Sequence, residues 1–379
     1  MDYSQLKPAT QCVHAGTIPD TTEAGVNSPV FVSTATGFLD RYENTYPRYF
    51  NTPNQQAVVA KLCALEQGEA GLVMSSGMAA ISTAFTALLN PGDHVVLQDQ
   101  IYGGTYHFAL AQLKKLGVDY TLVKGASVDS FSQAIQSNTK LMYFETPSNP
   151  LLKVYDVRGI SQLAGERGII SMIDNTFASP INQNPLVLGT DIVMHSGTKY
   201  LGGHSDLCFG ALITSTALQQ TMVKSAIDWG SSLNAMTCQQ IERSLKTLSL
   251  RVRRQNENAM FLAKKLEQHA AIKKVHYPGL ESHPGHDLAK SQMSGFGGML
   301  SFELHQEGSA VAFCKRLKLI KPVLSLGGVE TIVSIPGLTS HIKMSKEERL
   351  NAGISDDLIR MSVGIEDVED ILQDLMRAV

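Results

Sequence analysis

The chain has 379 residues, of which 43% are hydrophobic, and a formal net charge of −3. This length and apolar content suffice for one large or two medium domains. No basic excess points to nucleic acid or an anionic membrane as a partner, and no run approaches the length of a membrane span. The cluster of Arg251, Arg253 and Arg254 lies in a helical pattern and is interpreted as a solvated or interface face. Five scattered cysteines without a C-x-x-C pair argue against a disulfide framework and a zinc site, and predict a cytoplasmic protein.

Residues 1–55 differ in amino-acid composition from the rest of the chain. They are rich in Thr, Pro, Gly and Asn, with only short apolar stretches, which predicts an extended arm. The chain starts without the apolar run of a signal peptide. The arm contains a Tyr-x-Arg pair, Tyr46 and Arg48. Its Arg suits phosphate oxygens, although a loop with a chance Arg is the plainer interpretation.

Residues 56–249 alternate between strand-like and helix-like stretches. This alternation predicts an α/β domain with a mostly parallel sheet and helices on both faces. Strands are predicted at 71–74, 94–98, 118–123, 140–146, 169–173, 191–194 and 209–214. Helices are predicted at 55–65, 78–89 and 156–167, and a long helix at 236–268 is expected to bridge two domains.

Two turns in this region suggest ligand contacts. Ser76, Gly77 and Met78 open a helix, where free N–H groups suit an anion, although many helices begin in this way. Tyr102 follows another strand and precedes two glycines. These glycines clear space for the ring to lie flat on a planar ligand, while a core aromatic is the alternative.

Asp174 and Lys199 follow two further predicted strands. Ligands of α/β sheets collect at the carboxyl ends of strands, so the acid and the amine are expected at one crevice. Ser196 and Thr198 form a hydroxylated turn beside Lys199 that suits a phosphate. Pyridoxal phosphate needs a Lys for its Schiff base and an acid for its ring nitrogen, and fits this set. A salt-bridged Asp and a surface Lys on ordinary strands are the plainer alternative.

Residues 250–379 predict a smaller α+β domain. Strands are expected at 272–277, 298–304 and 329–333, with helices near 309–318 and 365–378. Arg360 lies in a further apolar strand, L-I-R-M-S-V-G. A buried Arg needs an anionic partner, which is either a substrate carboxylate or a structural acid such as Glu366 or Asp367.

Two histidine pairs raise the question of a metal. They are His195 with His204, and His283 with His286. No carboxylate completes a convincing set of ligands, so no metal is predicted.

The runs D-N-T-F-A-S-P from Asp174 and H-S-G-T-K-Y-L-G-G-H-S-D from His195 resemble the signature of the cysteine/methionine-metabolism family of pyridoxal-phosphate enzymes. The resemblance covers nearly the whole chain. The family includes cystathionine β- and γ-lyases, cystathionine γ-synthase, methionine γ-lyase and O-acylhomoserine sulfhydrylases. It implies the fold of fold-type-I enzymes, pyridoxal phosphate, an amino-acid substrate, and a homodimer with shared sites that pairs into a tetramer.

The resemblance also assigns roles to residues. Lys199 carries the cofactor and then acts as a general base, Asp174 keeps the ring nitrogen protonated, and Tyr102 stacks on the ring and moves a proton. Arg360 binds the substrate carboxylate, with Ser325 beside it. Further cofactor contacts are implied for Ser76, Gly77, Met78, Asn149, Ser196 and Thr198, with Tyr46 and Arg48 supplied by the partner subunit.

Three further positions bear on the substrate. Family members that process cystathionine by γ-chemistry carry an acid, an Arg and a Glu where this chain has Thr45, His107 and Leu324. The loss of these charges predicts a carbon–sulfur lyase for small sulfur amino acids such as methionine, homocysteine or cysteine, with cystathionine a poorer γ-substrate. A γ-replacement enzyme, an aminotransferase and a non-catalytic relative are the alternatives.

Overall fold

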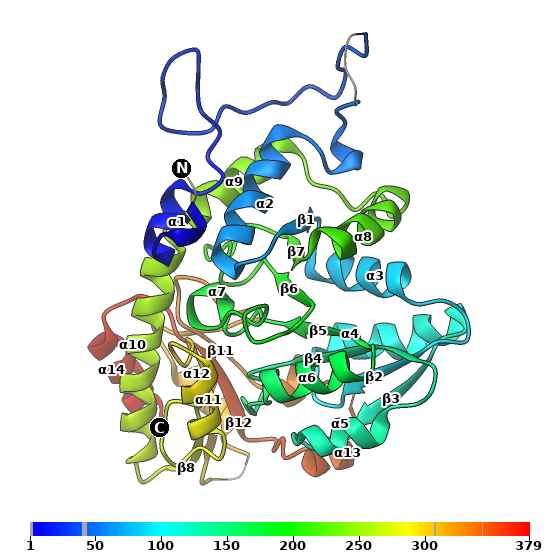
Figure 1. The fold of residues 1–379 in the computed structure, drawn as a ribbon. Coiled ribbons are helices and arrows are strands. Elements are labelled where there is room, and N and C mark those ends of the chain that lie inside the picture. The colour runs from blue at the N-terminus through cyan, green and yellow to red at the C-terminus, as the bar shows by residue number, and fades with distance from the viewer. Residues whose placement is uncertain (1–2, 40–43, 307, 343) are drawn as a thin grey trace.

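The computed structural model describes residues 3–39, 44–306, 308–342 and 344–379. Two sheets organise the fold (Figure 1). The larger has seven strands in the order β1-β7-β6-β5-β4-β2-β3, and only β7 runs antiparallel to its neighbours. Its strands are β1 (Ala70–Met74), β2 (His94–Gln98), β3 (Asp119–Val123), β4 (Thr139–Glu145), β5 (Ile170–Asp174), β6 (Ile192–Ser196) and β7 (Gly210–Thr214).

Helices cover both faces of the larger sheet, because its strands are apolar on both faces. Alternate residues of β2 illustrate this: Val95 and Leu97 pack in the core that contains α3 and α8, whereas Val96 packs toward α5 and α6. The prediction of a mostly parallel sheet covered on both sides is confirmed. The helices are α2 (Pro53–Glu66), α3 (Gly77–Leu88), α4 (Gly103–Phe108), α5 (Val128–Ala134), α6 (Val157–Glu166), α7 (Ser179–Asn182), α8 (Thr216–Trp229) and α9 (Ala235–Leu245), with the short turns η3 (Ala109–Leu113) and η4 (Lys114–Leu116).

The second sheet has five strands in the order β10-β11-β12-β9-β8 and is mostly antiparallel. The prediction of a smaller C-terminal α+β part is confirmed. Its strands are β8 (Ile272–His276), β9 (Met299–Leu304), β10 (Lys321–Pro322), β11 (Ile332–Ser334) and β12 (Leu358–Ser362). The helices of this part are α10 (Leu248–Glu267), α11 (His286–Gln292), α12 (Ala310–Arg316), η5 (Pro336–Leu338), α13 (Lys346–Asn351) and α14 (Val368–Ala378).

The single long helix predicted over 236–268 is wrong, because the chain breaks between α9 and α10. The two helices bury different surfaces. Ile241 of α9 packs with α2 on the larger sheet, whereas Leu262 and Leu266 of α10 pack on the second sheet. One straight helix could not cover both. We propose to place the domain boundary at residues 249/250, in the first turn of α10.

The N-terminal arm carries three short elements, η1 (Tyr3–Gln5), α1 (Pro8–His14) and η2 (Pro47–Tyr49). Lys61 of α2 anchors α1 by donating from Nζ to the carbonyl oxygens of Cys12 (3.0 Å) and Val13 (3.3 Å). After α1, the described residues up to 39 extend away from the sheets (Figure 1). Several apolar side chains there are exposed: Val26, Phe31, Val32, Phe38 and Leu39.

The interpretation of the arginine cluster as a solvated face is wrong for Arg251. Arg253 and Arg254 are exposed, but Arg251 is 4% exposed. Its guanidinium donates to the carbonyl oxygens of Tyr200 (2.7 Å) and Ser244 (3.0 Å). The Tyr200 carbonyl lies in the turn after Lys199 and takes its hydrogen bond from this guanidinium. The Ser244 carbonyl lies near the end of α9 and also accepts from the Thr247 N–H at 3.3 Å. Arg251 thereby fixes the turn that follows Lys199.

Candidate active site

The carboxyl ends of β4, β5 and β6 lie side by side. The predicted acid, Asp174, ends β5, and the predicted amine, Lys199, lies in the turn that follows β6. Glu145 pairs with Asp174 in the register of β4 and β5, and Asp174 pairs with Met194 in that of β5 and β6. The chain leaves β6 in a tight turn, in which the Lys199 N–H donates to the Ser196 carbonyl oxygen at 3.1 Å.

Asp174 is buried at the end of β5 with spare hydrogen-bonding capacity. Its Oδ1 accepts from the Thr176 N–H at 3.0 Å, and its Oδ2 accepts from the Tyr143 hydroxyl at 3.4 Å. Burial raises the pKa of Asp174, and the Thr176 hydrogen bonds and His195 oppose this rise. A buried carboxylate of this kind is stabilised by a cationic N–H donor, such as a protonated ring nitrogen.

Lys199, Ser325 and Arg360 form a connected group. Lys199 Nζ donates to Ser325 Oγ at 2.7 Å, and Arg360 Nη2 donates to the Ser325 carbonyl oxygen at 3.3 Å. Ser325 has a φ of 88°, a strained left-handed conformation for a residue with a side chain. Burial, followed by the positive charge of Arg360, lowers the pKa of Lys199. The lower pKa suits an amine that acts as a nucleophile or base.

Arg360 is buried in β12 and directed toward the larger sheet. Its Nη1 donates to Asn149 Oδ1 at 2.9 Å. A structural pairing with Glu366 or Asp367 is not found: Glu366 accepts from the Thr331 N–H and hydroxyl, and Asp367 caps α14. Arg360 therefore retains donors for an incoming carboxylate.

A candidate anion-binding site, called the anion seat below, lies where the N-terminus of α3 packs against the end of β6. A Cβ on Gly77 would come within 2.9 Å of Ser196 Cβ, so only glycine allows the helix N-terminus this close. Ser76 caps α3 with its side chain. The Thr198 hydroxyl donates to the Phe209 carbonyl oxygen at 3.2 Å. The free N–H groups of α3 and the Ser196 hydroxyl suit phosphate oxygens.

The ring of Tyr102 lies beside Gly104 and Met78. A Cβ on Gly104 would lie 2.5 Å from Tyr102 Cε1 and 3.0 Å from Met78 Sδ, so the glycine does leave space for the ring. The ring is 48% exposed, which excludes the core-aromatic interpretation. Acid, amine, anion seat and exposed ring thus gather at one edge of the sheet, and these residues fit pyridoxal phosphate.

Several predicted residues lie outside this group. In its own chain, Arg48 Nη1 donates to the Ile227 carbonyl oxygen of α8 at 3.0 Å, and Tyr46 packs edge-on against Tyr49. The Thr45 carbonyl oxygen accepts from Thr36 in the arm. His107 is exposed on α4, and Leu324, directly before Ser325, is 67% exposed.

Sequence reasoning missed two buried carboxylates beside the site. Glu145 is 6% exposed, and burial, followed by the charge of Asp174, raises its pKa. Glu66 ends α2 and is fully buried; its Oε1 lies 2.5 Å from His195 Nε2 and accepts from Asn175 at 2.9 Å. The only sequence signal for Glu145 is its place after an apolar strand. Within the described residues, no group of three or more His, Cys, Asp or Glu side chains could hold a metal ion.

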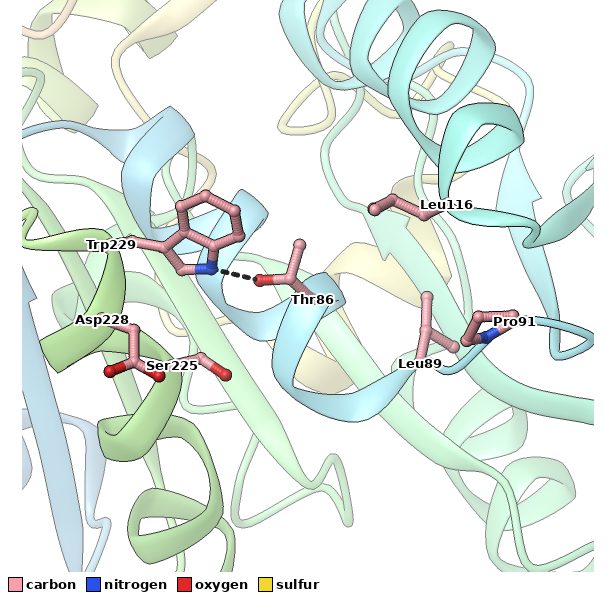
Figure 2. Close-up of a pocket in the computed structure, with 7 residues that line it drawn as sticks. All are labelled: Thr86, Leu89, Pro91, Leu116, Ser225, Asp228 and Trp229. Carbon is pink, nitrogen blue, oxygen red and sulfur yellow. Dashed lines mark hydrogen bonds between the residues drawn. The ribbon is translucent and has the colours of Figure 1, made fainter.

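A separate surface depression of about 290 Å³ lies at the other end of α3 (Figure 2). Trp229 at the end of α8 borders it and donates from Nε1 to Thr86 Oγ1 at 3.1 Å. Leu89, Pro91 and Leu116 form its apolar side. The residues that line this depression include no lysine or arginine beside Asp228, and the depression is not part of the candidate active site.

Comparisons with known proteins identify the family of the chain. Residues 9–379 match the family described as Cys/Met metabolism PLP-dependent enzyme. The chain is 44% identical to cystathionine gamma-lyase of Bacillus subtilis over 98% of this chain and 99% of that protein. It is 41% identical to cystathionine beta-lyase of Lactococcus lactis over 97% and 98%, and 40% identical to cystathionine gamma-synthase of Mycobacterium tuberculosis over 98% and 96%. The structure of cystathionine gamma-lyase from Lactobacillus plantarum, complexed with L-serine, superposes with a TM-score of 0.95 at 39% identity over 98% of each chain.

Proposed function

The chain belongs to the Cys/Met metabolism family of pyridoxal-phosphate-dependent enzymes, and on that premise we propose that it is a carbon–sulfur lyase for short sulfur amino acids. It cleaves methionine, homocysteine or cysteine to a 2-oxo acid, ammonia and a thiol, and takes cystathionine less well by γ-elimination. The similar proteins include two kinds of lyase and a synthase, so the choice of reaction rests on this chain's own residues.

The observation that carries the proposal is the absence of three charged side chains at positions 45, 107 and 324. Leu324 exposes an apolar side chain directly before Ser325, and neither Thr45 nor His107 supplies the acid or arginine that a second amino-acid head would pair with. Removing such a charged head from water without a partner costs several kcal/mol. A short thioether gains about 0.8 kcal/mol for each methylene it buries against Leu324.

The chain's own residues account for the remaining steps. Arg360 binds the substrate α-carboxylate with a planar pair of donors. The Nζ of Lys199 takes the α-proton as a general base, held by Ser325. When bound, pyridoxal phosphate supplies an electron sink for the charge that develops at the α-carbon. Asp174 retains the proton on the ring nitrogen, and the Tyr102 hydroxyl donates a proton to the departing sulfur.

We further propose that two subunits share each site. Arg48 lies on η2 and contacts α8, and Tyr46 directly precedes η2 and packs against Tyr49; neither contact is with Ser76 or Gly77. The exposed apolar side chains of the arm give it a surface to bury against a second copy of the chain. The arm of one subunit then brings Tyr46 and Arg48 to its partner's phosphate.

A substrate panel tests the proposed reaction. The purified holoenzyme is assayed for kcat/KM with methionine, homocysteine, cysteine and cystathionine, and with O-acetylhomoserine plus sulfide. The proposal expects one of the three short substrates to exceed cystathionine. A preference for cystathionine of about tenfold or more, equivalent to 1.4 kcal/mol, would refute the apolar-pocket argument.

The second candidate is γ-replacement, which the similarity to a cystathionine gamma-synthase favours. Replacement would use the same Lys199, Asp174 and Arg360, but a thiol or sulfide would form a new bond at the γ-carbon after the leaving group departs, and the amino group would be retained. Turnover confined to O-acetylhomoserine with a thiol or sulfide would assign the chain to this branch.

A further inference from the structure

Glu145 ends β4 at the middle of the site, and each of its carboxylate oxygens accepts a backbone hydrogen bond. The Tyr102 N–H donates to Oε2 at 2.9 Å, and the Asn149 N–H donates to Oε1 at 3.0 Å. The two donors are 47 residues apart in sequence. One carboxylate therefore sets the spacing between two loops that carry residues proposed to contact the cofactor.

A negative charge at this position is costly. Glu145 is 6% exposed, and its register partner Asp174 carries a second carboxylate on the same face of the sheet. Burial, followed by the charge of Asp174, raises the pKa of Glu145, and the two N–H donors and Arg360 oppose the rise. A glutamine would avoid the charge, but it offers one accepting oxygen, and its NH₂ group would face one of the N–H donors. Only a carboxylate accepts from both loops.

The loop of Tyr102 depends on this anchor. Two glycines follow Tyr102, whose ring is half exposed and lies where a side chain on Gly104 would otherwise stand. Asn149 is held from both sides, since its N–H donates to Glu145 and its Oδ1 accepts from Arg360 at 2.9 Å. Glu145 thus joins the Tyr102 loop to the residues that hold the substrate carboxylate.

We propose that Glu145 is a positioning residue that fixes Tyr102 and Asn149 relative to each other, and thereby sets the seat of the cofactor ring. It touches neither cofactor nor substrate, and acts through the two backbone N–H groups. The inference rests on the proposed cofactor contacts of Tyr102 and Asn149, which are tested separately below.

The test compares Glu145→Gln with Asp374→Asn. Asp374 is a matched control: it is 3% exposed and accepts from the N–H groups of Lys318, Leu319 and Ile320 at 2.9 Å each, in the second sheet region. Two readouts are independent of turnover, namely the visible circular dichroism of the bound cofactor and the affinity of the apo-protein for pyridoxal phosphate. Thermal unfolding of each variant reports the purely structural cost.

Glu145→Gln is expected to lose most of the visible circular dichroism and to bind the cofactor about tenfold more weakly, since one N–H donor is left unpaired. Asp374→Asn is expected to lower the melting temperature but to keep both cofactor signals. Glu145→Asp retracts the carboxylate by one methylene and is expected to change the signals in the same direction. Glu145→Asp replaces Glu145→Gln in this test if Glu145→Gln does not fold.

Two further variants separate this inference from the site assignment. Tyr102→Ala and Asn149→Ala are expected to change the circular dichroism by themselves. If they do, and a folded Glu145→Gln or Glu145→Asp retains wild-type dichroism and affinity, Glu145 does not position these residues. If neither Tyr102→Ala nor Asn149→Ala changes the signals, the proposed cofactor contacts are wrong, and the inference falls with them.

Discussion

The hydroxyl of Ser325 is expected to orient Lys199 during proton transfer, and its removal in Ser325→Ala isolates that role. The 2.7 Å contact from Lys199 Nζ is the hydrogen bond at stake. Arg360 contacts the Ser325 backbone carbonyl, which alanine retains. The substitution should therefore disturb the base and leave the carboxylate seat in place.

The expected size follows from the nature of this contact. A hydrogen bond to a charged group contributes about 1.5–3 kcal/mol, and Lys199 is mostly buried, so water replaces it poorly. This corresponds to a fall in kcat of about 10- to 150-fold, with KM changed less than about threefold. Steady-state kinetics on the preferred substrate measures both parameters.

Two controls accompany this variant. Ser362→Ala removes the hydroxyl that accepts from the Gly327 N–H at 2.7 Å, and so loosens the same loop without touching Lys199. Ser325→Gly relieves the backbone strain at φ 88° and should be more stable than Ser325→Ala by about 1 kcal/mol. A kcat within about twofold of wild type for Ser325→Ala, or the same loss in Ser362→Ala, would contradict the orienting role.

Three further predictions address assembly, electrostatics and stability. Mixed Arg48→Ala and Lys199→Ala chains should regain activity after subunit exchange, because one hybrid site has both residues; no recovery despite demonstrated exchange would argue against shared sites. In the apo-protein, the lowered pKa of Lys199 should let its amine react with acetic anhydride at lower pH than surface lysines do, as measured by peptide mass spectrometry. Arg360→Gln removes a positive charge and should move the midpoint of the pH dependence of this acetylation to higher pH. An unchanged midpoint would contradict the effect of Arg360. Arg251→Met should lower the free energy of unfolding by roughly 2 kcal/mol, because the Tyr200 carbonyl oxygen loses its donor, whereas Arg253→Met on the exposed face should change it little; equal melting temperatures for the two variants would contradict this role of Arg251.

Sequence patterns predicted the large sheet well because its strands are short apolar runs that end in polar residues. Adjacent parallel strands place such ends together, so Asp174 and the Lys199 turn could be expected at one edge. The glycine beside Tyr102 was likewise interpretable, since only a missing side chain leaves room for the ring.

The contacts that connect the site could not be predicted in this way. Ser325 lies 126 residues from Lys199, and the two acceptors of Glu145 serve loops that only the packed sheet brings together. Helical periodicity likewise predicts Arg251 on a solvent face, because it contains no information on the Tyr200 carbonyl of a distant turn, to which Arg251 donates. Such contacts depend on tertiary packing, which local patterns do not encode.

The most direct test of the proposed lyase is the stoichiometry of products from homocysteine or methionine with the purified holoenzyme. The account predicts equal amounts of thiol, ammonia and 2-oxo acid, and none of them with Lys199→Ala. A 2-oxo acid formed without ammonia, or a new thioether formed in place of the 2-oxo acid, would contradict elimination and assign the site to amino transfer or to replacement.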